Sequence, residues 1–183
     1  MAYEEVRTEQ PEFADGGAIE DRLDAAHLEV DRAAMATISS VYRAASAIRR
    51  HVEQTVLAAS RLSWTGYTAM FAVWVYGEME TRHLAAQVDV AKGTLTGVLD
   101  TLEGRGLVTR RRHADDRRQV SVALTAVGEQ LVADVLPKAT EQATRMVQLL
   151  SASEQMAITT GLSRLVECLP QLRQDDAAAK ADQ

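Results

Sequence analysis

The residues of this sequence best suited to chemistry are polar and basic side chains between positions 92 and 118. The first group, at the start of a predicted helix, is Lys92, Gly93, Thr94 and Thr96. Small residues there let the backbone approach a phosphate, and hydroxyl groups can reach phosphates or base edges. The second group is a run of arginines, at positions 105, 110, 111, 112, 117 and 118. Because guanidinium groups are attracted to the negative potential of a narrow minor groove, the two groups together predict a surface that binds double-stranded DNA.

Two short helices and a hairpin are predicted to position these residues. The apolar residues of the helices recur at helical spacing: Leu84, Ala85 and Val88 in the first, and Leu95, Val98, Leu99 and Leu102 in the second. Residues 89–91 between them are long enough only for a tight turn, which gives a helix-turn-helix. Gly104 and Gly106 end the second helix. Alternating apolar residues then indicate a strand with one buried face, at Val120, Val122 and Leu124. The hairpin that carries the arginines is therefore predicted to be a wing.

Length and composition exclude several classes of protein. At 183 residues with 46% apolar content, the chain is long enough to bury a core. No apolar run approaches the roughly 18 residues of a membrane helix, and the N-terminus is acidic, so we expect a cytoplasmic protein without a membrane partner. Cys168 is the single cysteine, and no Cys/His cluster, nucleophile with a paired base, or glycine-rich phosphate loop is visible. We therefore expect that the protein is not an enzyme and that it binds neither a metal nor a cofactor.

The formal net charge of −6 argues against a nucleic-acid binder only if the charges are evenly spread. Residues 1–31 hold ten acidic residues and two arginines, so the remaining chain is slightly basic. Residues 105–118 hold six arginines against Asp115 and Asp116, which predicts a positive local field. Such a run is commonly a solvated surface, but its place in a hairpin after a helix-turn-helix favours DNA binding.

The pattern predicts a mainly α-helical protein with one small β-hairpin. Residues 1–26 are acidic and poor in large apolar residues, which indicates a mobile arm. Residues 27–60 contain no Gly or Pro and carry a helical apolar stripe, so one long helix is expected. At 1.5 Å per residue this helix spans on the order of 50 Å, and part of its stripe must pack on another chain. Dimerisation is the simplest explanation.

Three further segments complete the predicted organisation. Residues 61–124 form the winged helix-turn-helix DNA-binding domain, including a helix over about 65–78. Residues 125–170 form C-terminal dimerisation helices, with a kink at Pro137 and an end at Pro170. Residues 171–183 are expected to be a flexible tail.

The order of these elements and several short motifs resemble the MarR family of winged-helix transcription regulators, over roughly residues 28–169. The motifs are Leu84-Ala85, Lys92-Gly93-Thr94-Leu95-Thr96, Leu99, Leu102-Glu103, Gly106-Leu107-Val108, Asp116-x-Arg118 and Leu124-Thr125-x-x-Gly128. The resemblance implies a homodimer whose outer helices interdigitate and whose lobes each place a recognition helix in the major groove and a wing in the minor groove. It further implies a transcriptional regulator, with repression as the expected mode, that binds a pseudo-palindromic operator sequence-specifically.

The resemblance also assigns roles within the wing. Arg118 occupies the position whose side chain enters the minor groove, and Asp116 the acidic position that orients this arginine. An ordinary surface ion pair is the alternative interpretation. Arg112 and Arg117 complete the set of wing residues expected to contact DNA.

Two positions depart from the family pattern. Asp89 stands where the turn usually has Gly, and Ala91 stands where a capping Ser usually begins the recognition helix. Asp tolerates a left-handed backbone, whereas Ala cannot cap a helix, so the start of this helix is expected to be weakened by about 1 kcal/mol.

Regulators of this family usually release DNA when a small, often aromatic ligand enters a crevice between the dimer helices and the DNA-reading lobe. The residues expected to border such a crevice are Arg49, His51, Trp64, Tyr67 and Phe71. Aromatic residues at helical spacing more often belong to a core, so both interpretations stay open. Cys168 lies in the last helix without a basic neighbour, which argues against an oxidation sensor.

Two other functions remain open from the residues alone. One is an architectural DNA-binding protein with little sequence preference, and the other is a helical protein-interaction module. The arginine-rich wing disfavours the interaction module, and the hydroxyls of Thr94 and Thr96 favour sequence reading over pure architecture.

The wing assignment gives a direct prediction. Arg118→Ala is expected to weaken DNA binding by about 1–3 kcal/mol and to leave folding nearly unchanged. Titration of labelled duplex with wild-type and variant protein measures the first effect, and thermal unfolding measures the second. An unaltered binding curve would remove Arg118 from the mechanism.

Overall fold

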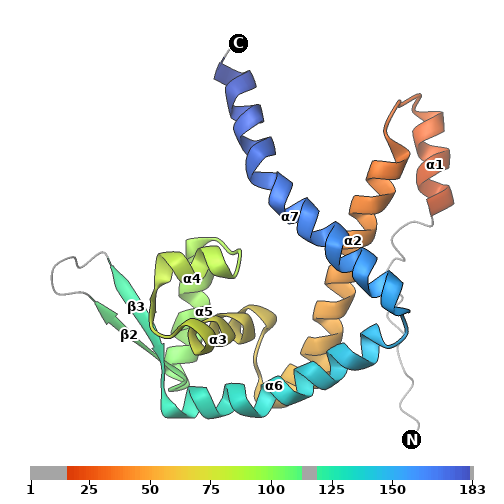
Figure 1. The fold of residues 1–183 in the computed structure, drawn as a ribbon. Coiled ribbons are helices and arrows are strands. Elements are labelled where there is room, and N and C mark those ends of the chain that lie inside the picture. The colour runs from red at the N-terminus through yellow and green to blue at the C-terminus, as the bar shows by residue number, and fades with distance from the viewer. Residues whose placement is uncertain (1–15, 113–118, 182–183) are drawn as a thin grey trace, which may run out of the picture. The chain divides into compact units, whose positions relative to one another are not determined.

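The structure is a computed structural model that describes residues 16–112 and 119–181 (Figure 1). It divides into two compact units, residues 1–48 and residues 49–183, which are described separately. Asp116, Arg117 and Arg118 lie outside the described residues, so their roles in the wing stay predictions. None of the described helices is long and apolar enough to cross a membrane.

The first unit contains α1 (Gly16–Ala25) and most of α2 (Arg32–Val52). Its two helices are separated by His27, which has a left-handed backbone with φ of 52°. The Asp31 carboxylate then accepts a hydrogen bond of 2.9 Å from the backbone N–H of Ala34. Asp31 therefore caps α2, because it satisfies one of the N–H groups that have no partner at a helix start.

These helices correct two predictions about the N-terminal segment. The mobile arm predicted over residues 1–26 is wrong for residues 16–25, which form α1. The long helix predicted from residue 27 begins at Arg32 instead, because the chain turns at His27 and α2 is capped by Asp31.

The second unit begins with the end of α2 and continues in helical turns of other types. Glu53–Leu57 form a π-helical turn and Ala58–Ser60 a 3₁₀ turn, and Arg61 follows with φ of 51°. The Glu53 carboxylate accepts a hydrogen bond of 2.8 Å from the backbone N–H of Trp64, the first residue of α3. The predicted helix over residues 27–60 thus reaches its predicted end, but not as a uniform α-helix.

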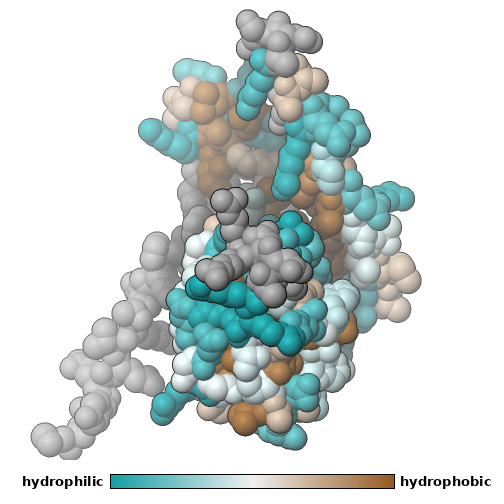
Figure 2. Space-filling view, turned by 90° about the vertical axis from the view of Figure 1, so that its left-hand side faces the viewer, coloured by the Kyte–Doolittle hydropathy of each residue, from teal (hydrophilic) through white to brown (hydrophobic). Residues whose placement is uncertain are grey.

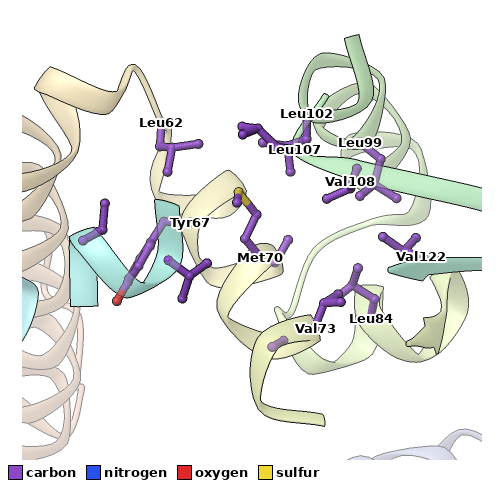
Figure 3. Close-up of a cluster of buried hydrophobic side chains, with 14 of the residues drawn as sticks. Leu62, Tyr67, Met70, Val73, Leu84, Leu99, Leu102, Leu107, Val108 and Val122 are labelled. Carbon is purple, nitrogen blue, oxygen red and sulfur yellow. The ribbon is translucent and has the colours of Figure 1, made fainter. Parts of the chain in front are cut away.

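The core of the second unit is built around α3 (Trp64–Tyr76), which is apolar on nearly all sides and packs against α4, α5, α6 and β3. Figure 3 shows Met70 and Val73 of this helix among buried side chains from the neighbouring elements. The largest fully buried residues are Leu57, Met70, Leu84, Leu95, Leu99, Leu102, Val108, Val122 and Val132. The periodic residues of the predicted helix-turn-helix therefore supply much of the core.

The helix-turn-helix consists of α4 (Thr81–Gln87) and α5 (Lys92–Gly104). Asp89 in the turn has φ of 50°, so the predicted left-handed position is confirmed. Ala91 precedes α5 and forms no side-chain hydrogen bond to any described residue at the helix start, as predicted. Gly104 is the last residue of α5, and Gly106 reverses the chain with φ of 68°.

The wing is part of an antiparallel sheet with the strand order β1-β3-β2, and Figure 1 shows its hairpin extending away from α3, α4 and α5. β2 (Val108–Arg112) pairs with β3 (Val120–Leu124), with Arg112 opposite Val120. The third strand, β1 (Met79–Glu80), was not predicted, because two residues are too few to show a period.

The predicted alternation of β3 is only partly confirmed. Val122 is buried as expected, but Ser121 on the opposite face is buried as well. β3 is the central strand, and the small Ser121 lies in register between Glu80 of β1 and Arg111 of β2.

The C-terminal part consists of α6 (Ala126–Val147) and α7 (Ala152–Ala181). Thr125 caps α6 as predicted, accepting a hydrogen bond of 3.1 Å from the backbone N–H of Gly128. The predicted end at Pro170 and the flexible tail from residue 171 are wrong, because α7 continues through Pro170 to Ala181. A proline removes one helical hydrogen bond without forbidding the next turn, and the alanines that follow have the highest helix propensity.

Gly128 gives a test of how tightly α6 packs. A Cβ atom at this position would lie 2.0 Å from the carbonyl oxygen of Leu107, which also accepts a hydrogen bond of 3.1 Å from the backbone N–H of Thr125. The two atoms nearest to this Cβ, the carbonyl oxygen and carbon of Leu107, belong to the backbone and cannot move aside as the end of a side chain can. We therefore expect Gly128→Ala to lower the free energy of unfolding by about 1–3 kcal/mol or more. Urea unfolding at a fixed protein concentration measures this change.

Gly97→Ala in α5 is the matched control, since Gly97 is exposed, lies outside the proposed dimerisation segments, and has nothing within 4 Å of a Cβ placed there. It is expected to leave stability unchanged or to raise it by up to about 1 kcal/mol. Equal losses for the two variants would contradict the close packing at Gly128.

Candidate nucleic-acid interface

The first predicted group of DNA-contacting residues lies at the exposed start of α5. Lys92, Gly93, Thr94 and Thr96 are all exposed in the structure. The opposite side of the same helix is anchored in the core by Leu95, Leu99 and Leu102. The polar residues are therefore presented by a helix whose position is fixed by packing, which is what precise contact with a groove requires.

Two details define the chemistry of this helix start. The hydroxyl of Thr96 donates a hydrogen bond of 2.9 Å to the carbonyl oxygen of Lys92, which leaves its oxygen lone pairs available as acceptors. Because Ala91 provides no cap, the first N–H groups of α5 are not satisfied by a capping side chain of the described residues. An incoming phosphate oxygen can accept from these groups and from Lys92.

The second predicted group lies on the wing. Of its residues, Arg112 is described: it is the last residue of β2 and is exposed. Figure 2 views the molecule from the side of the wing and shows hydrophilic side chains gathered beside the ends of β2 and β3.

The other arginines of the described run are bound to the protein itself. The guanidinium of Arg105 donates to the carbonyl oxygens of Ser60 and Arg61, at 2.7 Å and 2.9 Å. Arg111 forms an ion pair with Glu78. Within residues 105–112, Arg112 alone makes no such bond to another described residue.

Arg110 is held most completely. Its Nε and Nη2 atoms donate to Glu103 Oε2 at 2.9 Å and 2.6 Å, its backbone N–H donates to Glu103 Oε1 at 3.1 Å, and Nη2 also lies 2.6 Å from Asp100 Oδ1. These bonds lower the pKa of the Glu103 carboxyl and raise that of the Arg110 guanidinium.

The ion pairs reduce the positive charge that the sequence predicted over residues 105–118. Sequence reasoning weighed the arginines only against Asp115 and Asp116, whereas the fold places three further carboxylates beside them, from Glu78, Asp100 and Glu103. No spacing rule reveals these partners, because Asp100 and Glu103 meet Arg110 only when the turn at Gly106 folds β2 back along α5, and Glu78 meets Arg111 from the residue before β1.

Comparison with known proteins now decides the family. The model of the MarR family matches residues 62–120, which run from before α3 to the first residue of β3 and include both predicted groups. An uncharacterised HTH-type transcriptional regulator of Bacillus subtilis, YwaE, is 32% identical over 133 residues, which cover 73% of this chain and 77% of that protein. The chain belongs to the MarR family.

Solved structures support the same fold at lower sequence identity. The S. aureus MepR–DNA complex has a TM-score of 0.65 at 20% identity and covers 72% of this chain and 97% of that one. BpsR of Bordetella bronchiseptica, a protein whose DNA binding is regulated by 6-hydroxynicotinic acid, has a TM-score of 0.65 at 23% identity and covers 71% and 98%. As a MarR-family protein, the chain is a transcriptional regulator and not an enzyme.

The residues expected at an effector crevice lie on α2 and α3. Arg49 and His51 are exposed, and His51 Nε2 lies 3.1 Å from Oε1 of Gln142 in α6. Trp64, Tyr67 and Phe71 form a ladder along α3 with ring centroids 6.4 Å and 6.1 Å apart. Tyr67 is buried, and the other two are half-buried against the core.

Within one chain, this arrangement supports the interpretation that the aromatic residues of α3 belong to the hydrophobic core. The structure has surface cavities of about 260 Å³ beside Gly66 and Val98 and about 400 Å³ beside Thr109 and Ser121. Neither of these two cavities is lined by any of the five residues expected at the crevice.

The lowered pKa of Glu103 has a consequence for stability that can be measured. A carboxyl whose pKa is lowered by folding stabilises the folded state above its unfolded pKa, and this contribution is lost as pH falls through the folded pKa. We therefore expect Glu103→Gln to cost stability at neutral pH, and the difference from wild type to shrink once pH falls below the usual value of 4.5. Urea unfolding of both proteins between pH 7 and pH 3 measures this; a difference that stays constant over that range would contradict it.

Proposed function

We propose that this MarR-family regulator binds a pseudo-palindromic operator sequence-specifically as a homodimer and represses transcription there. The observation that carries the proposal is the start of α5, where Lys92, Gly93, Thr94 and Thr96 are exposed on a helix anchored by its other face. Small residues, hydroxyls, a cation and an uncapped helix start together suit a duplex better than any small-molecule reaction.

In the proposed complex, α5 enters the major groove and the wing follows the adjacent minor groove. Thr94 and Thr96 then reach base edges or phosphates, and Lys92 contacts the backbone. Arg112, Arg117 and Arg118 supply the wing's positive charge, with Asp116 orienting Arg118. The similar fold of the MepR–DNA complex is consistent with this arrangement.

The proposed homodimer rests on large apolar residues that stay exposed in a single chain. They include Ile38, Tyr42 and Ile48 on α2, and Met156, Ile158, Leu162, Val166 and Leu169 on α7. Monomeric proteins rarely expose large contiguous apolar patches, and a second copy presents the same helices as the natural cover. Residues 27–60 and 125–170 are then the dimerisation segments, and residues 61–124 form the DNA-binding domain.

A small aromatic effector that releases DNA is the regulation we propose for this dimer. BpsR, which shares the fold, responds to 6-hydroxynicotinic acid. In this chain the half-buried rings of Trp64 and Phe71 could contact an aromatic ligand, and Arg49 and His51 could receive its carboxylate or phenolate. The ladder through Tyr67 would then link the effector to the helix that packs on α5.

The operator test compares a palindromic duplex from the gene's own upstream region with random duplex at fixed salt. Wild-type protein is expected to prefer the palindrome, with half-site centres roughly 10 base pairs apart. Lys92→Ala should weaken binding to every duplex and reduce the slope of log affinity against log salt by about 1. Lys180→Ala, which removes an exposed lysine near the end of α7 and outside the proposed dimerisation segments, is the control and should leave both measurements unchanged.

Two outcomes would overturn this proposal. Equal affinity for palindromic and random duplexes would favour an architectural DNA-binding protein. A single-chain mass by light scattering at micromolar concentration, both alone and with DNA, would exclude the homodimer.

A further inference from the structure

One carboxylate joins the recognition helix to the wing. Glu103, in the last turn of α5, accepts three hydrogen bonds from Arg110 at the middle of β2. Two come from the guanidinium and one from the backbone N–H, so the strand is fixed as well as the side chain. Asp100, one turn earlier in α5, binds the same guanidinium through Nη2 at 2.6 Å.

This arrangement differs from an ordinary surface ion pair. Isolated exposed pairs contribute little to stability, because water screens them and two long side chains must be ordered. Here the Arg110 side chain is only 24% exposed, and its planar fork meets one carboxylate through two donors. A charge-assisted contact of this kind constrains direction as well as distance.

The short connection between α5 and β2 makes the contact of Glu103 with Arg110 relevant to the position of the wing. Only Arg105, Gly106 and Leu107 connect α5 to β2, and Gly106 has φ of 68°, a left-handed conformation that glycine adopts without steric cost. Arg112, at the outer end of β2, lies two residues beyond Arg110. A small rotation of β2 about the Gly106 turn would therefore displace the residues at the end of the wing.

We propose that Glu103 is a positioning residue for DNA binding, which holds the wing at the angle at which it reaches the duplex beside α5. This inference rests on the proposed function. Arg110 is then part of the clamp and does not contact phosphate, since Nε and Nη2 of its guanidinium are bound by the two carboxylates of α5.

The proposal and simple electrostatics predict opposite effects for Glu103. Removing a negative charge near a polyanion should strengthen binding if Arg110 contacts DNA directly, because its guanidinium would be released. Removing the clamp should weaken binding, because the wing would lose its fixed direction. The sign of the change therefore separates the two mechanisms.

The experiment uses the full-length protein and the preferred duplex from the operator test. Glu103→Gln and Arg110→Gln are each expected to weaken binding about tenfold and to reduce the salt slope by about 1, as wing contacts to phosphate are lost. The double variant should bind no more weakly than either single variant, because both remove the same clamp. Asp175→Asn, which removes an exposed carboxylate near the end of α7 and outside the proposed dimerisation segments, is the charge-matched control and should bind as wild type does.

Arg110→Lys tests the geometry with the charge retained. Lysine keeps a cation beside both carboxylates but cannot form the fork, so weaker binding with a reduced salt slope supports the clamp. This variant also decides the matter if Glu103→Gln fails to fold, as judged by its thermal unfolding midpoint.

Each contrary outcome has a distinct meaning. Unchanged or tighter binding by folded Glu103→Gln would overturn the clamp, and so would wild-type binding by Arg110→Lys. Additive losses in the double variant would show that Arg110 has a separate role at the DNA. Failure of the wild-type protein to bind any duplex would overturn the proposed function itself, and with it the role of the clamp.

Discussion

The last turn of α5 is the constraint on which the arrangement of the DNA-reading lobe depends. Glu103 holds β2 through Arg110, and Arg105 donates to the carbonyl oxygens of Ser60 and Arg61 at the end of the long helical segment. The carbonyl oxygen of Gly106 accepts a hydrogen bond of 2.6 Å from the hydroxyl of Thr125, which also caps α6. Three elements are thus tied to one helix end, so the angle of α5, the wing and the start of the C-terminal helices are set together.

The same contacts determine where the positive charge of the arginine run lies. The arginines that sequence alone groups together divide in the fold into two sets with different tasks. Arg105, Arg110 and Arg111 bind carbonyl or carboxylate oxygens of the protein and contribute mainly to geometry. Arg112 extends beyond them at the end of β2. This division neutralises positive charge near α5. It keeps the positive charge of Arg112 at the end of β2, where the proposed contact with the minor groove would lie.

Sequence periodicity predicted α3, α4, α5 and β3, because each of them buries one face or nearly all of its surface in the core, whereas β2 followed only as the partner strand of the predicted hairpin. It failed where burial does not decide the structure. Where their side chains are described, α1 and the last turns of α7 are mostly exposed, and β1 is two residues long. At the interface, the exposed start of α5 followed from its polar residues, whereas the partners of Arg105, Arg110 and Arg111 did not. Those contacts join residues that only the folded backbone brings together, so no linear spacing encodes them.

The absence of a cap at Ala91 fits the proposed binding of a phosphate at the start of α5. A Ser or Asp at this position would occupy the first N–H groups and stabilise the free protein by about 1 kcal/mol. Ala91 leaves those groups unsatisfied by any capping side chain of the described residues, beside the exposed Lys92 and Gly93. A phosphate bound there would provide the missing acceptor and interact favourably with the positive end of the helix dipole. The helix start would then be less stable in the free protein than in the complex, whereas the other end of α5 is already held by the contacts of Glu103 and Arg105 in the free protein. Such a helix can adjust its first turn to a duplex without changing the angle of the wing.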